Sequence, residues 1–429
     1  MAMDDIPFAL PFIGREEEDA ALRVLRSGWL TTGKEALAFE AEFARYFGLE
    51  RLGARAVNSA TAGLHLALEA LGIGPGDLVL VPSYTFTATA EVARYLGADV
   101  VFVDVKPGGF HLDPAALEAT LERLVQGLPP YPDRRGTSAA GGFGPRGKAR
   151  AVIPVHYGGL PCDMDALLPI AKRYGLKIVE DAAHAFPSRL PDGRWIGTIG
   201  DLGVFSFYAT KTITTGEGGM VVGYDDALLR RIEVMRSHGI DRSIWNRYSD
   251  PRASWYYEVI QPGFKYNMPD LLAAIGRVQL DRAALLLAQR EAIARRYDEA
   301  FEREAGLLIP PTGPGDARHL YPLRLNPAYG SPEQDAGHLD AGHLDAGHRN
   351  AFIAGLKNRG IGVSVHYIPL HIMPYYQKRY GLAPEDFPES LKSFRNVISL
   401  PIWPGMGEER VERVIAAVKE TLKRGAFPP

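Results

Sequence analysis

The sequence predicts an α/β protein with a mostly parallel sheet and a smaller C-terminal α+β domain. Between residues 54 and 206, short apolar runs alternate with helical patterns, as in a sheet whose crossovers are right-handed. After residue 316, short strands mix with helices in a different pattern. The length of 429 residues suits two domains, which we expect at residues 1–260 and 261–429.

The first half of the chain supplies most of the predicted sheet. Residues 15–48 read as two helical patches broken by SGWLTTGKE. After them, strands are predicted at residues 54–60, 77–83, 99–105, 149–159, 176–183 and 204–208, and helices at 61–72, 87–97, 113–126 and 163–175. Residues 129–148 are rich in Pro, Gly and Arg and lack periodicity, so we expect a surface insertion there.

The second half changes character after residue 222. A helix is predicted at 226–239, and residues 240–266 are Trp/Tyr/Arg-rich and loop-like. A long helical segment at 268–303 is placed to join the two domains. The C-terminal domain should contain strands at 320–326, 363–369 and 397–402 and helices at 349–360 and 409–425.

A tandem repeat, DAGHL-DAGHL-DAGHR, lies in a second insertion at residues 331–349. Its histidines, His338, His343 and His348, suggest a metal site at first sight. A five-residue period turns about 500° on an α-helix, so successive histidines would point about 140° apart. We therefore expect a duplicated exposed loop and no metal site.

Composition excludes several classes of protein. The net charge of −3, without a basic stripe, does not favour nucleic acid as a partner. The N-terminal stretch lacks the pattern of a signal peptide, and no apolar run approaches the roughly 20 residues of a membrane span. The single cysteine, Cys162, excludes an internal disulfide and a Cys-built metal site. We expect a soluble, cytoplasmic protein.

Polar residues follow several predicted strands, at the edge where parallel sheets bind ligands. Asn58-Ser59-Ala60-Thr61 opens a helix, which makes either an anion site suited to phosphate or an ordinary N-cap. Asp181 ends another strand, and Glu180 should point to the opposite face. Asp181 can pair with a protonated ring nitrogen or cap the next helix.

Lys211 stands in a Thr-rich turn between the apolar run VFSFY and the hairpin GEGGMVV. Taken alone, it is either a solvated loop lysine or an amine held at a strand end to form a Schiff base.

Together these pieces resemble the sugar-nucleotide aminotransferases of the DegT/DnrJ/EryC1/StrS family. The resemblance runs along almost the whole chain, in blocks that include SGWLTTGKEALAFEAEFARYFG, NSATAGLHLALEALGIGPGD, VPSYTFTATA, AVIPVHYGGLPCDMDAL, VEDAAHAF, IGTIGDLGVFSFYATKTITTGEGGMV, PGFKYNMPDLLAAIGRVQL and GIGVSVHYIPLH. It implies a pyridoxal 5'-phosphate (PLP) enzyme of fold type I, the aspartate-aminotransferase fold, with a seven-stranded sheet.

The resemblance also implies roles for the strand-end residues. Lys211 would form the internal aldimine and shuttle the proton, and Asp181 would keep the pyridine nitrogen protonated. His184 would lie near the phenolic oxygen of the cofactor. Tyr84, with Phe86 as the less favoured alternative, would stack on the ring. The phosphate would be held by Ser59, Ala60, Thr61 and Ser206.

A neighbouring subunit would complete the phosphate site through Lys265 or Asn267, so the resemblance implies a homodimer with shared active sites. The family meets its sugar nucleotide near the positions of Trp29, His156, Tyr157, His319, His366, Tyr367 and His371. For the aromatic residues among them, packing in the protein core is as good an explanation as contact with the substrate.

The implied reaction moves an amino group from L-glutamate to a nucleotide-linked keto sugar in a ping-pong cycle. PVHYGG, EDAAHA and GFKYN resemble members that make UDP-4-amino-4-deoxy-L-arabinose, which favours a 4-keto sugar. Dehydrating relatives replace the Schiff-base lysine with histidine, so Lys211 favours transamination. A PLP-dependent lyase or dehydratase and a non-catalytic PLP-binding relative are the alternatives.

Overall fold

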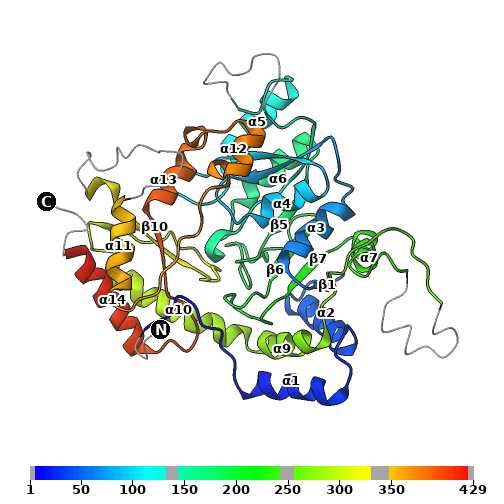
Figure 1. Cartoon of the computed structure of the whole chain (residues 1–429), viewed down its shortest axis with the longest axis horizontal. Coiled ribbons are helices and arrows are strands. Elements are labelled where there is room, and N and C mark those ends of the chain that lie inside the picture. The colour runs from blue at the N-terminus through cyan, green and yellow to red at the C-terminus, as the bar shows by residue number, and fades with distance from the viewer. Residues whose placement is uncertain (1–4, 132–143, 242–255, 330–346, 424–429) are drawn as a thin grey trace.

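The computed structural model describes residues 5–131, 144–241, 256–329 and 347–423, and its centre is a seven-stranded sheet (Figure 1). The strand order is β1-β7-β6-β5-β4-β2-β3. Strands β2 to β6 pair in parallel, and β7 is antiparallel to both β6 and β1. The mostly parallel seven-stranded sheet expected for this chain is confirmed. The strands are β1 (Gly53–Val57), β2 (Asp77–Pro82), β3 (Asp99–Val103), β4 (Lys148–Val152), β5 (Lys177–Asp181), β6 (Leu202–Ser206) and β7 (Gly219–Gly223).

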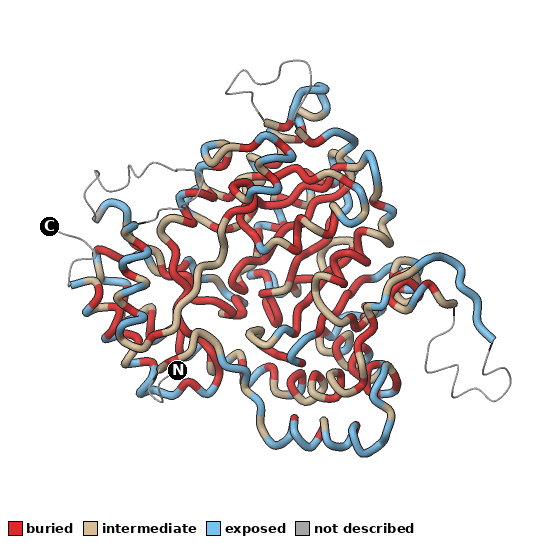
Figure 2. The backbone as a smooth tube through the Cα atoms, in the orientation of Figure 1, coloured by how far each residue is buried: buried red, intermediate tan, exposed pale blue. Residues whose placement is uncertain are grey.

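Helices cover both faces of this sheet, because alternate residues of each buried strand point to opposite sides. Ile178 packs in the cluster of one face and Val179 in that of the other. The first face is covered by α2 (Lys34–Tyr46), α5 (Pro114–Val125), α6 (Met164–Tyr174) and α9 (Asp270–Asp281). The second is covered by α3 (Ala60–Ala70), α4 (Ala88–Tyr95) and α7 (Asp226–Met235). Figure 2 shows the strands between these layers as largely buried.

A small antiparallel sheet lies in the C-terminal part of the chain. Its order is β10-β9-β8, formed by β8 (Leu307–Leu308), β9 (Tyr321–Leu325) and β10 (Val397–Leu400). The helices of this part are α10 (Ala283–Phe301), α11 (Gly347–Lys357), α12 (Pro374–Tyr380), α13 (Pro388–Asn396) and α14 (Glu408–Lys423). The remaining helix, α1 (Arg15–Ser27), packs on α9.

The long helix predicted at 268–303 is two helices that meet at Arg282. Helix α9 packs on α1 and α2 below the large sheet, and α10 packs on α14 beside the small one. Figure 1 shows α10 continuing from α9 toward the small sheet. The expected link between the two parts of the chain therefore exists, with a break in its middle.

Two further differences concern the C-terminal part. The strand predicted at 363–369 forms only an isolated bridge between Ser364 and Ser399. The residues that follow turn toward the cavity, which His366 and Tyr367 line. Ile6 pairs with Ile361 and is buried in the core of the small sheet, so the start of the described chain lies with the C-terminal part. The division into residues 1–260 and 261–429 stays a prediction.

The two insertions fall largely outside the described residues. Residues 132–143 belong to the first, and residues 331–346, with His338 and His343, belong to the second. The end of the repeat, from Gly347, is the start of α11. In the described part of the chain, no group of three or more His, Cys, Asp or Glu side chains is arranged to hold a metal ion. None of the described helices has the length and apolar character that crossing a membrane requires.

Candidate active site

A cavity of about 570 Å³ opens where β5 and β6 end and α3 begins. Both parts of the chain contribute to its wall. The N-terminal part supplies Ser59, Ala60, Thr61, Asp181, His184, Ser206 and Lys211, and the C-terminal part supplies His319, Ser364, His366 and Tyr367. The structure therefore brings together ten of the residues predicted from the sequence, at the sheet edge where ligands bind in parallel α/β folds.

Lys211 is held in a tight loop directly after β6. Its backbone N–H donates to the Tyr208 carbonyl at 2.9 Å, and the loop turns back through Gly216, whose φ of 83° lies in the left-handed region. The pKa of the Lys211 amine is lowered to about 8, chiefly by burial; Asp181 opposes this shift and the nearby Arg290 guanidinium adds to it. An amine of this pKa is partly neutral near neutral pH and can act as a nucleophile.

Asp181 faces the same cavity from the end of β5 and is 5% exposed. Its Oδ2 accepts a hydrogen bond from Thr89 Oγ1 of α4 at 2.8 Å, and its Oδ1 accepts one from the Ala183 N–H at 3.2 Å. Burial raises the pKa of this carboxyl, while the two donors and Lys211 oppose the shift. A buried carboxylate in this position is stabilised by any cation that enters the cavity.

Glu180 points to the other face of the sheet, as predicted from the strand pleat. Its carboxylate accepts hydrogen bonds from the backbone N–H groups of Gly197, Ile199 and Gly200, at 2.7 to 2.9 Å. It also pairs with His156 at 3.1 Å. Glu180 is therefore part of the scaffold, and only Asp181 of the two carboxylates reaches the cavity.

His156 is not at the cavity, which corrects its prediction as a substrate-binding residue. It follows Val155, which bridges to Asp181 and lines the cavity, so its own side chain falls on the Glu180 face. Its Nδ1 accepts from the Cys162 N–H at 3.0 Å, which leaves Nε2 to donate to Glu180. Val155 and His156 therefore point to opposite faces of the sheet, for the same reason as Asp181 and Glu180.

The start of α3 lies in the cavity wall. Ser59 is the N-cap and accepts from the Ala62 N–H, and Thr61 lies in the first turn. Gly219 of β7 lies so close that a Cβ there would come within 2.8 Å of the Ala60 nitrogen. Glycine at this position therefore lets β7 approach the helix start, where free N–H groups favour a phosphate.

A row of neutral rings forms the opposite wall. His184 Nδ1 accepts from the Gly158 N–H at 3.2 Å, so Nε2 carries the proton and donates to the Tyr367 hydroxyl at 2.8 Å. Burial holds the pKa values of His184 and His319 well below the ordinary range and lowers that of His366 to about 4. His319 Nδ1 is buried and has no hydrogen-bond partner among the described residues. This wall offers hydrogen bonds without charge.

Tyr84 and Tyr157 lie behind the cavity, which corrects both predictions. Each is at most 2% exposed, and each hydroxyl donates to the His366 carbonyl at 2.6 Å. They support the segment that carries His366 and Tyr367. Phe86, the less favoured alternative for stacking, is 53% exposed and lines the cavity. His371 is buried away from the cavity, between Ser83 and the Pro384 carbonyl.

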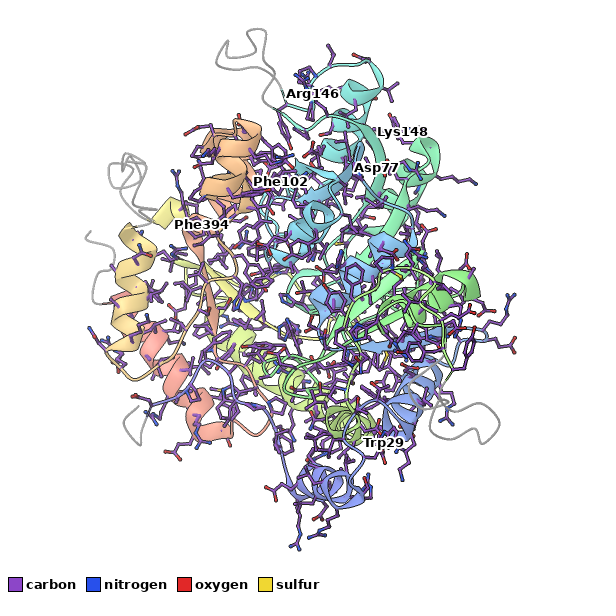
Figure 3. All side chains as sticks on the ribbon, turned by 45° about the vertical axis from the view of Figure 1, so that its right-hand side comes forward. Trp29, Asp77, Phe102, Arg146, Lys148 and Phe394 are labelled. Atoms are coloured by element: carbon purple, nitrogen blue, oxygen red, sulfur yellow. The ribbon has the colours of Figure 1, made fainter. Side chains whose placement is uncertain are left out.

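Trp29, Lys265 and Asn267 do not line this chain's own cavity. Lys265 Nζ donates to Asn267 Oδ1 at 2.6 Å, and Asn267 Nδ2 donates to Thr32 Oγ1 at 2.5 Å, which joins their segment to the loop after α1. Figure 3 shows Trp29 in the lower part of the molecule and Phe394 in its upper part. The predicted roles of Lys265 and Asn267 at a partner's site and of Trp29 near the sugar nucleotide stay predictions.

Two supporting residues are absent from the sequence prediction. Thr89 carries the hydroxyl that bonds Asp181, and Arg290 lies buried beside the Lys211 loop. The sequence carries a weak signal for each role: Thr89 is a threonine within a helix that packs on the sheet, and Arg290 is an arginine at an apolar position of α10. Neither signal identifies the hydrogen-bond partner.

Pyridoxal phosphate fits this cavity at three points. Lys211 would present the amine for its aldehyde, Asp181 the carboxylate for its ring nitrogen, and the start of α3 with Ser206 the donors for its phosphate. When bound, the cofactor supplies an electron-accepting ring. Lys211 is placed to move a proton, and the neutral rings of His184 and Tyr367 contribute hydrogen bonds. The fold and the site define a PLP-dependent enzyme of fold type I.

Comparison with known proteins identifies the family. The model of the DegT/DnrJ/EryC1/StrS aminotransferase family matches residues 11–419, and the chain belongs to this family. It is a transaminase of the sugar aminotransferase type, and pyridoxal phosphate is its cofactor.

Relatives match over nearly their full length. The chain is 43% identical over 422 residues to the spore coat polysaccharide biosynthesis protein SpsC of Bacillus subtilis, covering 97% of each chain. The PLP form of the putative sugar aminotransferase Spr1654 from Streptococcus pneumoniae has a TM-score of 0.81 at 30% identity, covering 99% of this chain and 100% of that one. PseC of Helicobacter pylori, an aminotransferase involved in the biosynthesis of pseudoaminic acid, has a TM-score of 0.81 at 26% identity, covering 98% and 100%.

Proposed function

We propose that this enzyme transfers an amino group from L-glutamate to a nucleotide-linked 4-keto sugar, in two half-reactions that share one cavity. The carrying observation is the neutral, hydrogen-bonding wall that faces Lys211. A sugar presents hydroxyl groups, and His319, Ser364, His366 and Tyr367 can bond them without a charge. SpsC acts in polysaccharide biosynthesis, as its name states, and Spr1654 is described as a putative sugar aminotransferase, which supports a sugar for this chain as well.

Lys211 and Asp181 are the proposed catalytic pair, with His184 in contact with the cofactor. Because the amine has a pKa of about 8, it can take and return a proton near neutral pH with little energetic cost. Asp181 is buried and pre-oriented by Thr89, so it can hold a protonated ring nitrogen. Phe86 is the proposed stacking residue.

The proposed working unit is a homodimer in which each copy completes the other's site. Among the described lining residues, Lys211 is the only lysine or arginine. A nucleotide diphosphate, the cofactor phosphate and the carboxylates of L-glutamate are all anions. We propose that the segment with Lys265 and Asn267, fixed to the loop after α1, enters the cavity of the partner copy. The proposed location is the cytoplasm, where a free cysteine such as Cys162 stays reduced.

The test begins with the purified, PLP-loaded enzyme and L-glutamate. The visible absorption of the bound cofactor should shift when glutamate is added and should return when an accepted keto sugar follows. A panel of nucleotide-linked 4-keto and 3-keto sugars, analysed by mass spectrometry, identifies the acceptor. Lys211→Ala should abolish turnover, and full turnover by this variant would refute the assignment. Release of ammonia or water without an amino donor would indicate a lyase or dehydratase.

A further inference from the structure

Arg290 of α10 is a buried guanidinium whose hydrogen-bond partners among the described residues are all backbone carbonyls. It is 2% exposed. One terminal nitrogen, NH1, donates to the carbonyls of His319 at 3.2 Å and Ile402 at 2.8 Å. The other, NH2, donates to the carbonyls of Thr210 at 3.3 Å and Lys211 at 3.5 Å. Among the described residues, no carboxylate forms an ion pair with it, and its Nε has no partner.

This arrangement is costly, so a structural reason is needed. A buried cation is usually paired with a carboxylate, and burial lowers the pKa of Arg290 to about 10. At neutral pH the guanidinium is still charged. An apolar side chain would fill the same volume without this cost, but it would leave the four carbonyl contacts unmade.

The four carbonyls belong to three segments that are separate in the sequence. Thr210 and Lys211 lie in the loop after β6, His319 precedes β9, and Ile402 follows β10. Lys211 and His319 line the active-site cavity from opposite parts of the chain. The planar fork of an arginine can hold several acceptors in one fixed geometry, which a lysine cannot do.

We propose that Arg290 is a positioning residue that fixes the backbone at Lys211 relative to the backbone at His319. Through these carbonyls it holds the amine and the neutral wall of the cavity at a constant separation. The inference concerns the same site as the proposed function and rests on Lys211 being its reactive amine, but its tests need neither substrate nor cofactor.

The charge of Arg290 acts on the same amine. The groups that face Lys211 are Asp181, whose charge raises the pKa of the amine, and Arg290, which together with burial lowers it. The rings of His184, His319 and His366 are neutral at pH 7, because burial and the lysine itself lower their pKa values. Arg290 therefore favours the neutral, nucleophilic form of the lysine, in addition to holding its loop.

The experiment compares three variants of the apoenzyme: Arg290→Met, Arg290→Lys and, as a control on the same helix, Arg296→Gln. Arg296 is half-exposed and forms ion pairs with Glu299 and Glu412 at the surface. Competitive acetylation of Lys211, quantified by peptide mass spectrometry across a pH series, gives the pKa of the amine. Hydrogen exchange of peptides that cover residues 207–213 and 317–321 reports on the two held segments.

The expected pKa of Lys211 is about 8 in the wild type and in Arg296→Gln. It should be higher in Arg290→Met but stay below the ordinary value, because burial, the larger cause of the shift, is unchanged. Arg290→Lys keeps the charge and should restore the low value, while both Arg290 variants exchange about tenfold faster in the two segments. An unchanged pKa in Arg290→Met would overturn the electrostatic role. If Arg290→Met does not fold, Arg290→Lys tests the positioning role alone. Hydrogen exchange at the wild-type rate in both segments of Arg290→Lys would overturn that role.

Discussion

Thr89→Val tests how Asp181 is prepared for the cofactor. Valine has nearly the shape of threonine but lacks the hydroxyl that donates to Asp181 Oδ2 at 2.8 Å and that contacts Thr85 Oγ1 at 2.8 Å. A hydrogen bond to a charged group contributes about 1.5–3 kcal/mol. Because the cofactor requires the ionised carboxylate, most of this energy should be lost from binding.

A loss of this size corresponds to an affinity for pyridoxal phosphate about ten to a hundred times weaker. The assay is a titration of the apoenzyme with the cofactor, followed by its visible absorption. Thr120→Val is the matched control, since Thr120 is also a helical threonine and its hydroxyl donates to the Ala116 carbonyl of α5. In the control, the affinity for the cofactor should not change.

A double-mutant cycle with Asp181→Asn separates the two explanations for a weaker affinity. Without the charge, the Thr89 hydroxyl contributes only about 0.5–1.5 kcal/mol, so Thr89→Val should cost less in the Asn background. Equal costs in both backgrounds would show that Thr89 supports the helix and not the carboxylate. A Thr89→Val enzyme that binds the cofactor like the wild type would refute the reasoning altogether.

Three further predictions follow from the same geometry. Lys211→Met should stabilise the apoenzyme by about 1–3 kcal/mol at pH 7, because folding lowers the pKa of the Lys211 amine from 10.5 to about 8 and so disfavours its charged form. Measured by denaturant titration, this gain in the free energy of unfolding should shrink between pH 8 and 10.5 and be absent above pH 10.5. His319→Phe should raise the KM for the keto sugar about tenfold and leave cofactor affinity unchanged, and an unaltered KM would remove His319 from the substrate site. His156→Leu should lower the free energy of unfolding by about 1–3 kcal/mol, because Glu180 and the Cys162 N–H lose a buried partner, with no change in KM; the opposite pattern would restore His156 to the substrate.

The elements that sequence predicts well are those with local causes. The strands carry continuous apolar runs and the helices carry periodic ones, so the sheet and most helices lie where expected. The residues after the strands of a parallel sheet must meet at one edge, which is why Lys211, Asp181 and Ser59 converge. The N-cap at Ser59 is likewise a local signal, because the hydroxyl bonds an N–H three residues away.

The misplaced residues depend on contacts distant in the chain. Tyr84 and Phe86 are both aromatic and differ by two positions, so sequence alone cannot decide which one is exposed. The choice follows from the His366 carbonyl, which the Tyr84 hydroxyl bonds across 282 positions of sequence. Arg290 stands at an apolar position of α10, but the sequence does not identify the distant carbonyls that it bonds. The segment around Tyr367 lacks a strand because it turns toward the cavity, which its β-branched residues do not reveal.

The opposite orientation of two adjacent carboxylates in β5 has a consequence for how this enzyme can fail. A slip of β5 by one residue against its neighbours would reverse the faces of its side chains, so that Asp181 would turn away from the cavity and Glu180 toward it. Such a slip would be strongly unfavourable, because the three backbone N–H groups that donate to Glu180 would each lose a charged acceptor. Glu180 contacts no substrate, but its hydrogen bonds fix the register of β5. Substitutions of Glu180 should therefore produce misassembled, inactive protein, even though every catalytic group is still present.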